Sequence, residues 1–226
     1  MSKCVFIGFD FSMNKPAMCI LYEKKFHFFI WPTDIPKNTI KLYEECNVNI
    51  NVRHIGSVST SIVNSQIVLE HTKRQVELAD LILNTIDEFM NSLCTEDDNT
   101  PNECDIFISS EGLSFASKGD AGLNLAGYKA VLLTKLYTHY NDRLKGLYTY
   151  PPISIKSIAG CAGKGKMKDK DAMINAFKKE PISHQFHTYL CNGKFNTKVH
   201  YMKCVDDIVD SYFAVKTMLK KEGFIK

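Results

Sequence analysis

The stretch Cys4-Val5-Phe6-Ile7-Gly8-Phe9-Asp10 decides the fold that we predict for this chain. Five of its first six residues are apolar, which predicts a strand buried on both faces that ends in a carboxylate. An ionised Asp10 in that position needs a partner, and a divalent cation, which prefers oxygen ligands, is well suited. The alternative is that Asp10 caps the following turn together with Ser12 and Asn14.

The residues after Asp10 predict an antiparallel meander. Ala17–Tyr22 is a second apolar strand, Glu23-Lys24 a turn, and 25–31 a third strand rich in aromatic residues. Apolar residues then recur at helical spacing over 64–93, which predicts a long amphipathic helix. The next apolar run, 104–111, again ends in an acid, Glu111, and because it follows a helix we expect it to lie parallel to the first strand.

The rest of the chain completes an α/β pattern. We expect helices at 123–140, 171–179 and Val205–Lys221, and a strand at 148–156 that Pro151 and Pro152 interrupt. Segments 32–61 and 181–201 are irregular, apart from an edge strand at 48–52, and we interpret both as insertions in one domain spanning 1–226.

Composition sets limits on location and partners. A formal charge of +3 means that any nucleic-acid contact comes from local clustering of basic residues. The eight cysteines form no compact framework and no signal peptide is evident, so we expect reduced thiols and an intracellular, cytoplasmic protein, with a viral protein inside its host cell, the nucleus or an organelle as alternatives. The apolar runs are shorter than the roughly 20 residues of a membrane span.

The last predicted helix opens with the acids Asp206, Asp207 and Asp210. Asp207 and Asp210 are three residues apart and so project from one face. Acids in a first turn gain about 0.3–1 kcal/mol each from the helix dipole. Beside two strand-end acids, each pair of charges would repel by about 4 kcal/mol at ~4 Å, so the group favours a bound divalent metal.

Two strand-end acids plus an acid pair on a closing helix, in a chain that opens with a meander, resemble the ribonuclease H-like superfamily. Within it, the sequence resembles the RuvC-type Holliday junction resolvases. The matching pieces are 8–12, Glu111 followed by Phe115, 121–127, the basic segment 152–156 with Lys170, and 207–211. The resemblance implies a central mixed five-stranded sheet, its first three strands antiparallel, flanked by helices.

The resemblance also implies a site and a reaction. Asp10, Glu111, Asp207 and Asp210 would be the catalytic residues and would bind two Mg²⁺ ions about 4 Å apart, or Mn²⁺ in their place, for phosphodiester hydrolysis. Asp206 is the second choice for Asp207. The expected substrate is a four-way DNA junction or other branched DNA, and the family acts as a homodimer, for which 123–136 is a candidate interface.

Basic residues near the acids predict contacts with DNA phosphates. The candidate DNA-binding residues are Phe115, Lys118, Lys156, Lys164, Lys166, Lys168 and Lys170. Phe115 could stack on bases or fold into the core. The loop 160–170 could instead be a solvated basic loop, and it lacks the Gly-Lys-Ser/Thr ending of a nucleotide-binding loop.

Three alternatives remain at this point. His184, His187, Cys191, His200 and Cys204 fall close enough in sequence to supply zinc ligands, although their spacing fits no common zinc pattern. A related nuclease could act on flaps, forks or RNA–DNA hybrids, since four acids fix the chemistry and leave the substrate open. The chain could also be a non-catalytic DNA-binding protein of the same fold.

Overall fold

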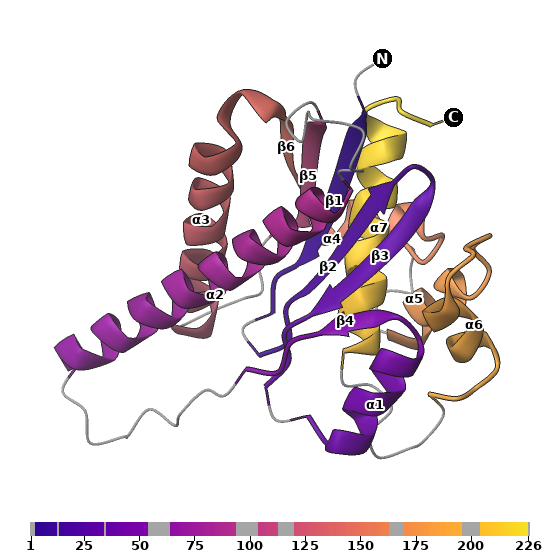
Figure 1. Cartoon of the computed structure of the whole chain (residues 1–226), viewed down its shortest axis with the longest axis horizontal. Coiled ribbons are helices and arrows are strands. Elements are labelled where there is room, and N and C mark those ends of the chain that lie inside the picture. The colour runs from indigo at the N-terminus through magenta and orange to yellow at the C-terminus, as the bar shows by residue number, and fades with distance from the viewer. Residues whose placement is uncertain are drawn as a thin grey trace. The chain divides into compact units, whose positions relative to one another are not determined.

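We describe a computed structural model of the chain (Figure 1). It describes residues 3–12, 14–33, 35–53, 64–93, 104–112, 120–162, 170–195 and 204–225. Its strands are β1 (Cys4–Asp10), β2 (Ala17–Tyr22), β3 (Lys25–Ile30), β4 (Val48–Ile50), β5 (Asp105–Glu111) and β6 (Leu144–Tyr150). Its helices are α1 (Lys37–Glu45), α2 (Asn64–Ser92), α3 (Asp120–Tyr140), α4 (Pro152–Ile158), α5 (Lys170–Phe177), α6 (Gln185–Cys191) and α7 (Val205–Lys221), with a short 3-10 turn at Asn141–Arg143.

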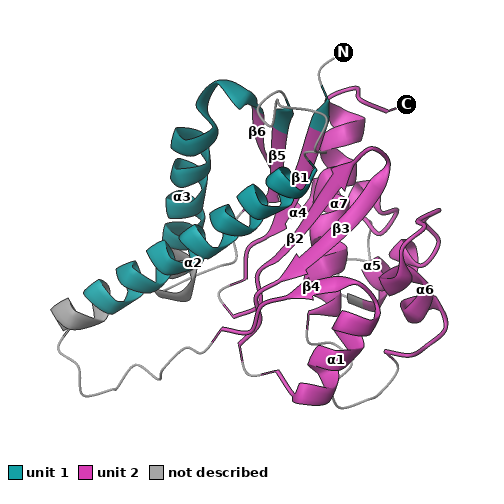
Figure 2. Cartoon of the chain, in the orientation of Figure 1, with its two compact units in different colours: residues 1–4, 55–106, 115–145 teal, residues 5–54, 107–114, 146–226 magenta. Residues whose placement is uncertain are grey.

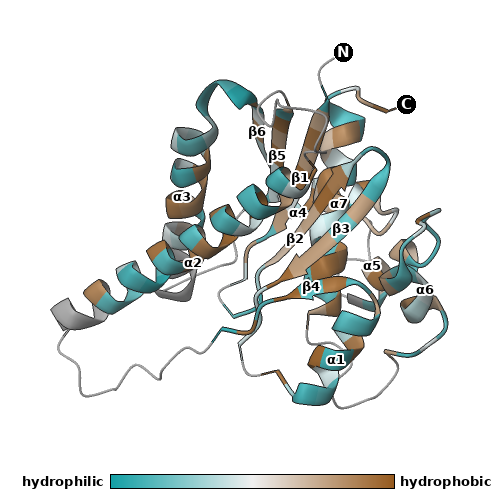
Figure 3. Ribbon diagram, viewed as in Figure 1, coloured by the Kyte–Doolittle hydropathy of each residue, from teal (hydrophilic) through white to brown (hydrophobic). Residues whose placement is uncertain are grey.

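The strands form one six-stranded sheet in the order β4-β3-β2-β1-β5-β6. β1, β2 and β3 are the predicted antiparallel meander, and Asp10 pairs with Ala17 while Ala17 pairs with Ile30. Glu23 and Lys24 both have positive φ, 45° and 65°, which gives the tight hairpin turn between β2 and β3 a twist that matches its strands. Figure 3 shows these strands coloured mostly hydrophobic, as expected for the centre of a sheet.

The number of strands differs from the five that we predicted. The sixth is β4, which is the edge strand expected at 48–52; it pairs parallel to β3 from Val48 to Ile50 and forms one edge of the sheet. A parallel partner needs a crossover connection, and α1 supplies it within the segment expected to be irregular. The fold class is therefore confirmed with one more strand.

The predicted strand at 148–156 is wrong in its second half. β6 ends at Tyr150, Pro151 is extended, and Pro152 begins helix α4, which runs to Ile158. Proline at the first helical position lacks only an N–H that would be unpaired there anyway, so Pro152 starts a helix instead of breaking a strand. The predicted irregular segment 181–201 likewise contains a helix, α6.

The strands that carry Asp10 and Glu111 are adjacent and parallel. Asp105 N donates to Lys3 O (2.9 Å), and Ser109 Oγ donates to Ile7 O (3.3 Å). The two bonds advance together along both strands, so β1 and β5 run in the same direction, as the right-handed crossover requires. The C-terminal ends of adjacent parallel strands lie side by side, so Asp10 and Glu111 are at the same end of their strands.

Contacts divide the chain into two compact units, coloured in Figure 2. Unit 1 comprises 1–4, 55–106 and 115–145, and unit 2 comprises 5–54, 107–114 and 146–226. In unit 1, α2 packs on α3, and Asp87 accepts hydrogen bonds from Tyr140 and pairs with His139. The prediction of a single domain stays a prediction.

Helix α7 is the central helix of unit 2. It contacts β2, β3, α4 and α5. Its buried apolar residues are Val205, Ile208, Val209, Tyr212, Phe213, Ala214, Val215, Met218 and Leu219. None of the helices described here is long and apolar enough to cross a membrane.

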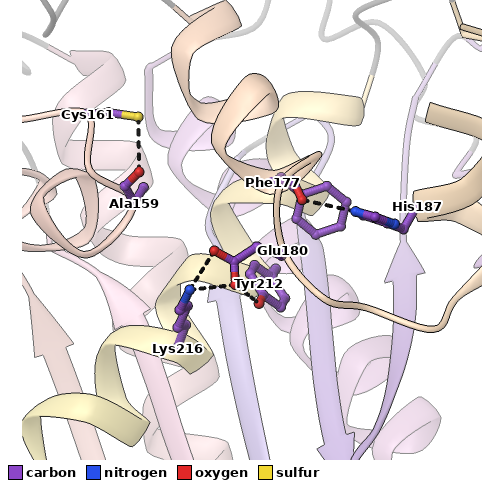
Figure 4. Close-up of polar contacts among 7 residues, drawn as sticks. All are labelled: Ala159, Cys161, Phe177, Glu180, His187, Tyr212 and Lys216. Atoms are coloured by element: carbon purple, nitrogen blue, oxygen red, sulfur yellow. Dashed lines mark hydrogen bonds and ion pairs between the residues drawn. The ribbon is translucent and has the colours of Figure 1, made fainter. Parts of the chain in front are cut away.

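Glu180, between α5 and α6, ties this part of the chain to α7 (Figure 4). Tyr212 Oη donates to Glu180 Oε2 (2.7 Å), and Lys216 Nζ contacts both oxygens of the same carboxylate. The Lys216 and Glu180 side chains are only 20% and 15% exposed, so the charges are partly removed from water. These contacts hold the middle of α7 against the segment between α5 and α6.

Candidate active site

Asp10 is the last residue of β1, the strand between β2 and β5. Its side chain is partly buried. The turn that follows is held by Ser12, whose Oγ accepts from Lys15 N (3.2 Å), and Asn14 O accepts from Thr33 N (2.9 Å). The turn therefore has hydrogen bonds that do not involve the Asp10 carboxyl, which favours a role for this group other than capping.

Glu111 is the last residue of β5 and is also partly buried. The strand end is held firmly, because Gly112 N donates to Tyr150 O (2.7 Å) and Ser110 Oγ lies 3.4 Å from Thr149 Oγ1. Since β1 and β5 are parallel neighbours, Asp10 and Glu111 lie next to each other at the C-terminal ends of these two strands. This is the convergence predicted from the two strand endings.

Helix α7 supplies the remaining acids. It begins after Cys204, which has a left-handed φ of 78°, and its first turn contains Asp206 and Asp207. Asp206 is buried (9% exposed), whereas Asp207 and Asp210 are partly exposed. A left-handed residue other than glycine is strained, and such residues are concentrated at functional sites.

The carboxyl groups interact with one another. Burial raises the pKa of Asp10 well above its usual value, and Asp207, Asp210 and Glu111 raise it further through their charges. A hydrogen-bonding contribution from the Asp207 side chain also raises the pKa of Asp10. The four predicted acids, which all belong to unit 2, are therefore brought together by β1, β5 and α7.

Asp210 shows the same effect. Burial, followed by the charges of Glu111, Asp206 and Asp207, raises the pKa of Asp210 to about 8. The positive charge of Lys156 acts in the opposite direction on this pKa. Lys156 was expected on a strand; it lies instead in the last turn of α4, and it is the predicted basic residue that the structure places near the acids.

The other predicted DNA-binding residues cannot be placed in the same way. Phe115, Lys118, Lys164, Lys166 and Lys168 lie outside the described residues. Lys170 is the first residue of α5, which fixes its backbone position only. Their roles stay predictions.

The acids fit a hard divalent cation by their chemistry. Carboxylate oxygens are the ligands that Mg²⁺ and Mn²⁺ prefer, and a group of acids that raise one another's pKa would be neutralised by such an ion. In the part of the chain that the structure describes, no three His, Cys, Asp or Glu side chains are already spaced to hold a metal. Binding of such an ion would require the carboxyl groups that hold it to be ionised.

The histidine and cysteine segment has other contacts. His184 Nδ1 accepts from Phe186 N (3.1 Å) and caps α6, and the His187 ring lies 3.1 Å from Phe177 O (Figure 4). Cys191 Sγ lies 3.8 Å from His187 Nε2, and Cys204 is buried before α7. His200 lies outside the described residues. These contacts account for the two histidines without zinc.

Tyr43 is a residue near the acids that sequence reasoning missed. It lies on α1, is fully buried, and has a pKa raised by burial and then by the charges of Cys204, Cys46, Asp207 and Asp206. The missed signal was the pair Thr39 and Tyr43, four residues apart and both buried on one face of α1. The segment predicted to be an insertion therefore reaches the start of α7.

Comparisons with known proteins bear on the fold. No family model matches the sequence, and no curated protein matches it. The crystal structure of the yeast mitochondrial Holliday junction resolvase Ydc2 is 14% identical, with a TM-score of 0.53 over 96% of this chain and 78% of that chain. RuvC of Thermus thermophilus, in a free structure and in a complex with a Holliday junction substrate, is 9% and 10% identical, with TM-scores of 0.41 and 0.39 over 96% of both chains. The protein thus has a ribonuclease H-like fold that is structurally similar to that of the yeast resolvase.

Proposed function

We propose that the protein is a metal-dependent DNA endonuclease that resolves Holliday junctions and other branched DNA. The observation that carries this proposal is the mutual effect of four carboxyls, in which Asp207, Asp210 and Glu111 all raise the pKa of Asp10. Buried acids that repel one another destabilise the free protein, which suits a site for divalent cations. The ribonuclease H-like fold and the sequence resemblance to RuvC-type resolvases supply the substrate class.

Asp10, Glu111, Asp207 and Asp210 are the proposed ligands for Mg²⁺ or Mn²⁺, with two ions in each site. Asp207 is preferred to Asp206 because Asp207, and not Asp206, is among the groups that raise the pKa of Asp10. When bound, divalent ions activate water and stabilise negative charge on phosphate oxygens. The protein's own part is to hold the four carboxylates on two adjacent strand ends and one helix face, where they orient the ions.

Lys156 is the proposed phosphate contact at the edge of the acid group. Its charge acts on Asp210, so a phosphate that binds beside the acids comes within reach of a cation. Lys164, Lys166, Lys168 and Lys170 would extend this contact along the DNA backbone, and Phe115 and Lys118 would meet bases and phosphate near the branch point. The proposed assembly is a homodimer, which light scattering on junction DNA would detect.

A cleavage assay tests the proposal. The assay uses four substrates in the presence of Mg²⁺: a four-way junction, a flap, an RNA–DNA hybrid and a linear duplex. Each is incubated with wild type, with Asp10→Asn, or with the control Asp142→Asn, which removes an exposed acid in unit 1. We expect wild type and the control to cut the junction. Asp10→Asn should lower the cleavage rate at least about 100-fold, since even residues that only support metal ligands contribute 10–100-fold to metal affinity or activity. Junction cleavage that survives Asp10→Asn would contradict the mechanism. Cleavage confined to flaps or hybrids would replace branched junctions as the proposed substrate. Binding without cleavage would identify a non-catalytic DNA-binding protein.

A further inference from the structure

Helix α7 lies in backbone contact with strand β1 at Gly8. A Cβ atom at position 8 would lie 2.3 Å from Ser211 O, 2.7 Å from Val215 Cγ2 and 2.9 Å from Val215 N. Distances below 3.0 Å are essentially never found for real Cβ atoms. Two of these three atoms belong to the helix backbone and cannot rotate away. A side chain at position 8 would therefore move the whole helix.

The requirement at Gly8 is for space. The described glycines with positive φ are Gly160, Gly193 and Gly223, so Gly8 has a backbone conformation that other residues also adopt. Gly8 and Val215 are both buried, and Gly8 lies in a strand that is paired on both sides. β1 cannot give way without disturbing the centre of the sheet, so α7 would be the element that shifts.

This contact lies next to the acids on both elements. Gly8 is two residues before Asp10 on β1, and Ser211 directly follows Asp210 on α7. Asp207 lies one helical turn from Ser211. The distance between the β1 and α7 backbones at Gly8 therefore sets the distance between the Asp10 carboxyl and the carboxyls of α7.

We propose that Gly8 is a positioning residue, which sets the spacing of the acid group by allowing α7 to lie directly on β1. In its metal-binding consequence this inference rests on the proposed function. Its structural part does not, since the contact of α7 with β1 at Gly8 exists without metal. Gly8→Ala would separate the two carboxyls and weaken both their interaction and divalent-cation binding.

The first test is a double-mutant cycle in the presence of EDTA. Asp10→Asn, Asp207→Asn and the double variant are compared by urea unfolding in wild-type and Gly8→Ala backgrounds, and the coupling between the two acids is taken from the four midpoints. We expect a clear coupling in wild type and a much smaller one in Gly8→Ala. The matched control is Val215→Ala, which removes a side chain from the same contact and leaves the backbone spacing unchanged. It should lower stability and keep the coupling.

The second test is titration with Mn²⁺, followed by electron paramagnetic resonance. Gly8→Ala should raise the dissociation constant at least about tenfold, the effect expected for residues that orient metal ligands, while Val215→Ala should stay close to wild type. If Gly8→Ala does not fold, Val215→Ile replaces it, because one added methyl group forces α7 away from β1 through a side chain. Val215→Ile should then lose coupling and Mn²⁺ affinity relative to Val215→Ala.

The outcomes separate the two proposals. Unchanged coupling in Gly8→Ala, or in Val215→Ile where Gly8→Ala is unfolded, would overturn the positioning role whatever the protein does. A wild-type protein that shows the coupling but binds no Mn²⁺ would contradict the proposed function and leave the positioning role standing. Loss of coupling together with loss of Mn²⁺ binding supports both.

Discussion

The carboxyl group of Asp210 is held in an environment that disfavours its charge. Its pKa is raised to about 8, so the folded protein resists ionisation that occurs near pH 4 in the unfolded chain. The free energy of unfolding should therefore fall as pH rises from about 4 to about 8. Asp210→Asn removes this cost, and in EDTA above pH 8 we expect it to stabilise the protein by about 1–3 kcal/mol in urea unfolding.

Bound Mg²⁺ should reverse the difference in stability between Asp210→Asn and wild type. Mg²⁺ stabilises the state that binds it, so saturating Mg²⁺ should raise the melting temperature of wild type more than that of Asp210→Asn. The exposed control Asp142→Asn should respond to Mg²⁺ like wild type. A variant that is less stable than wild type in EDTA would show that Asp210 has a structural role, and would contradict the repulsion argument.

His184 affects the pH dependence of the free energy of unfolding in the opposite direction to Asp210. Its pKa is lowered to about 4, by burial first and then by the charges of His27 and His187. Lys25, Glu44 and His27 line a cavity of about 450 Å³ with it. The fold favours neutral His184, so the contribution of this residue to the free energy of unfolding is complete above pH 6.5. This contribution, roughly 1–3 kcal/mol, is lost as pH falls toward about 4.

The substitution that isolates this effect is His184→Asn. Asn keeps an oxygen that can accept from Phe186 N at the start of α6, and it does not titrate. In urea unfolding between pH 4 and 7, the difference in stability between the variant and wild type should grow in favour of the variant as pH falls. A constant difference across this range would rule out His184 as the titrating group.

At the scale of elements, the contact between Glu180 and α7 makes the clearest prediction. Glu180→Gln leaves the largely buried Lys216 ammonium without a charged partner, which should cost about 1–3 kcal/mol after allowance for partial exposure. Glu70→Gln, in the exposed Glu70–Lys73 pair of α2, should change stability by less than about 0.5 kcal/mol. Equal effects in chemical denaturation would mean that burial does not distinguish the two pairs.

The elements that sequence reasoning missed are the short ones. Long patterns with one period identified β1, β2, α2 and α7 correctly, since a strand or helix of that kind must bury one recognisable set of residues. α1, α4 and α6 have nine residues or fewer and follow prolines or polar residues, so tertiary packing decides their conformation. In α6 the pair Phe186 and Leu190, both buried, was the usable signal.

At the scale of the whole molecule, the acid group was predictable because each part follows from topology. Strand endings at Asp10 and Glu111 must meet once β1 and β5 are parallel neighbours, and α7 presents Asp207 and Asp210 on one face. The choice between Asp206 and Asp207 was not predictable, because it depends on the rotation of α7 about its axis. That rotation follows from packing on β2, β3, α4 and α5, which sequence periodicity alone does not give.

The pairing of the first strand with the last helix also bears on how the protein folds. Gly8 and Ser211 lie in contact across some 200 residues of chain, so this contact closes a long loop. Contacts between such distant residues slow folding. During synthesis on the ribosome, β1 emerges long before α7, so the acid group cannot assemble until α7 has also left the exit tunnel.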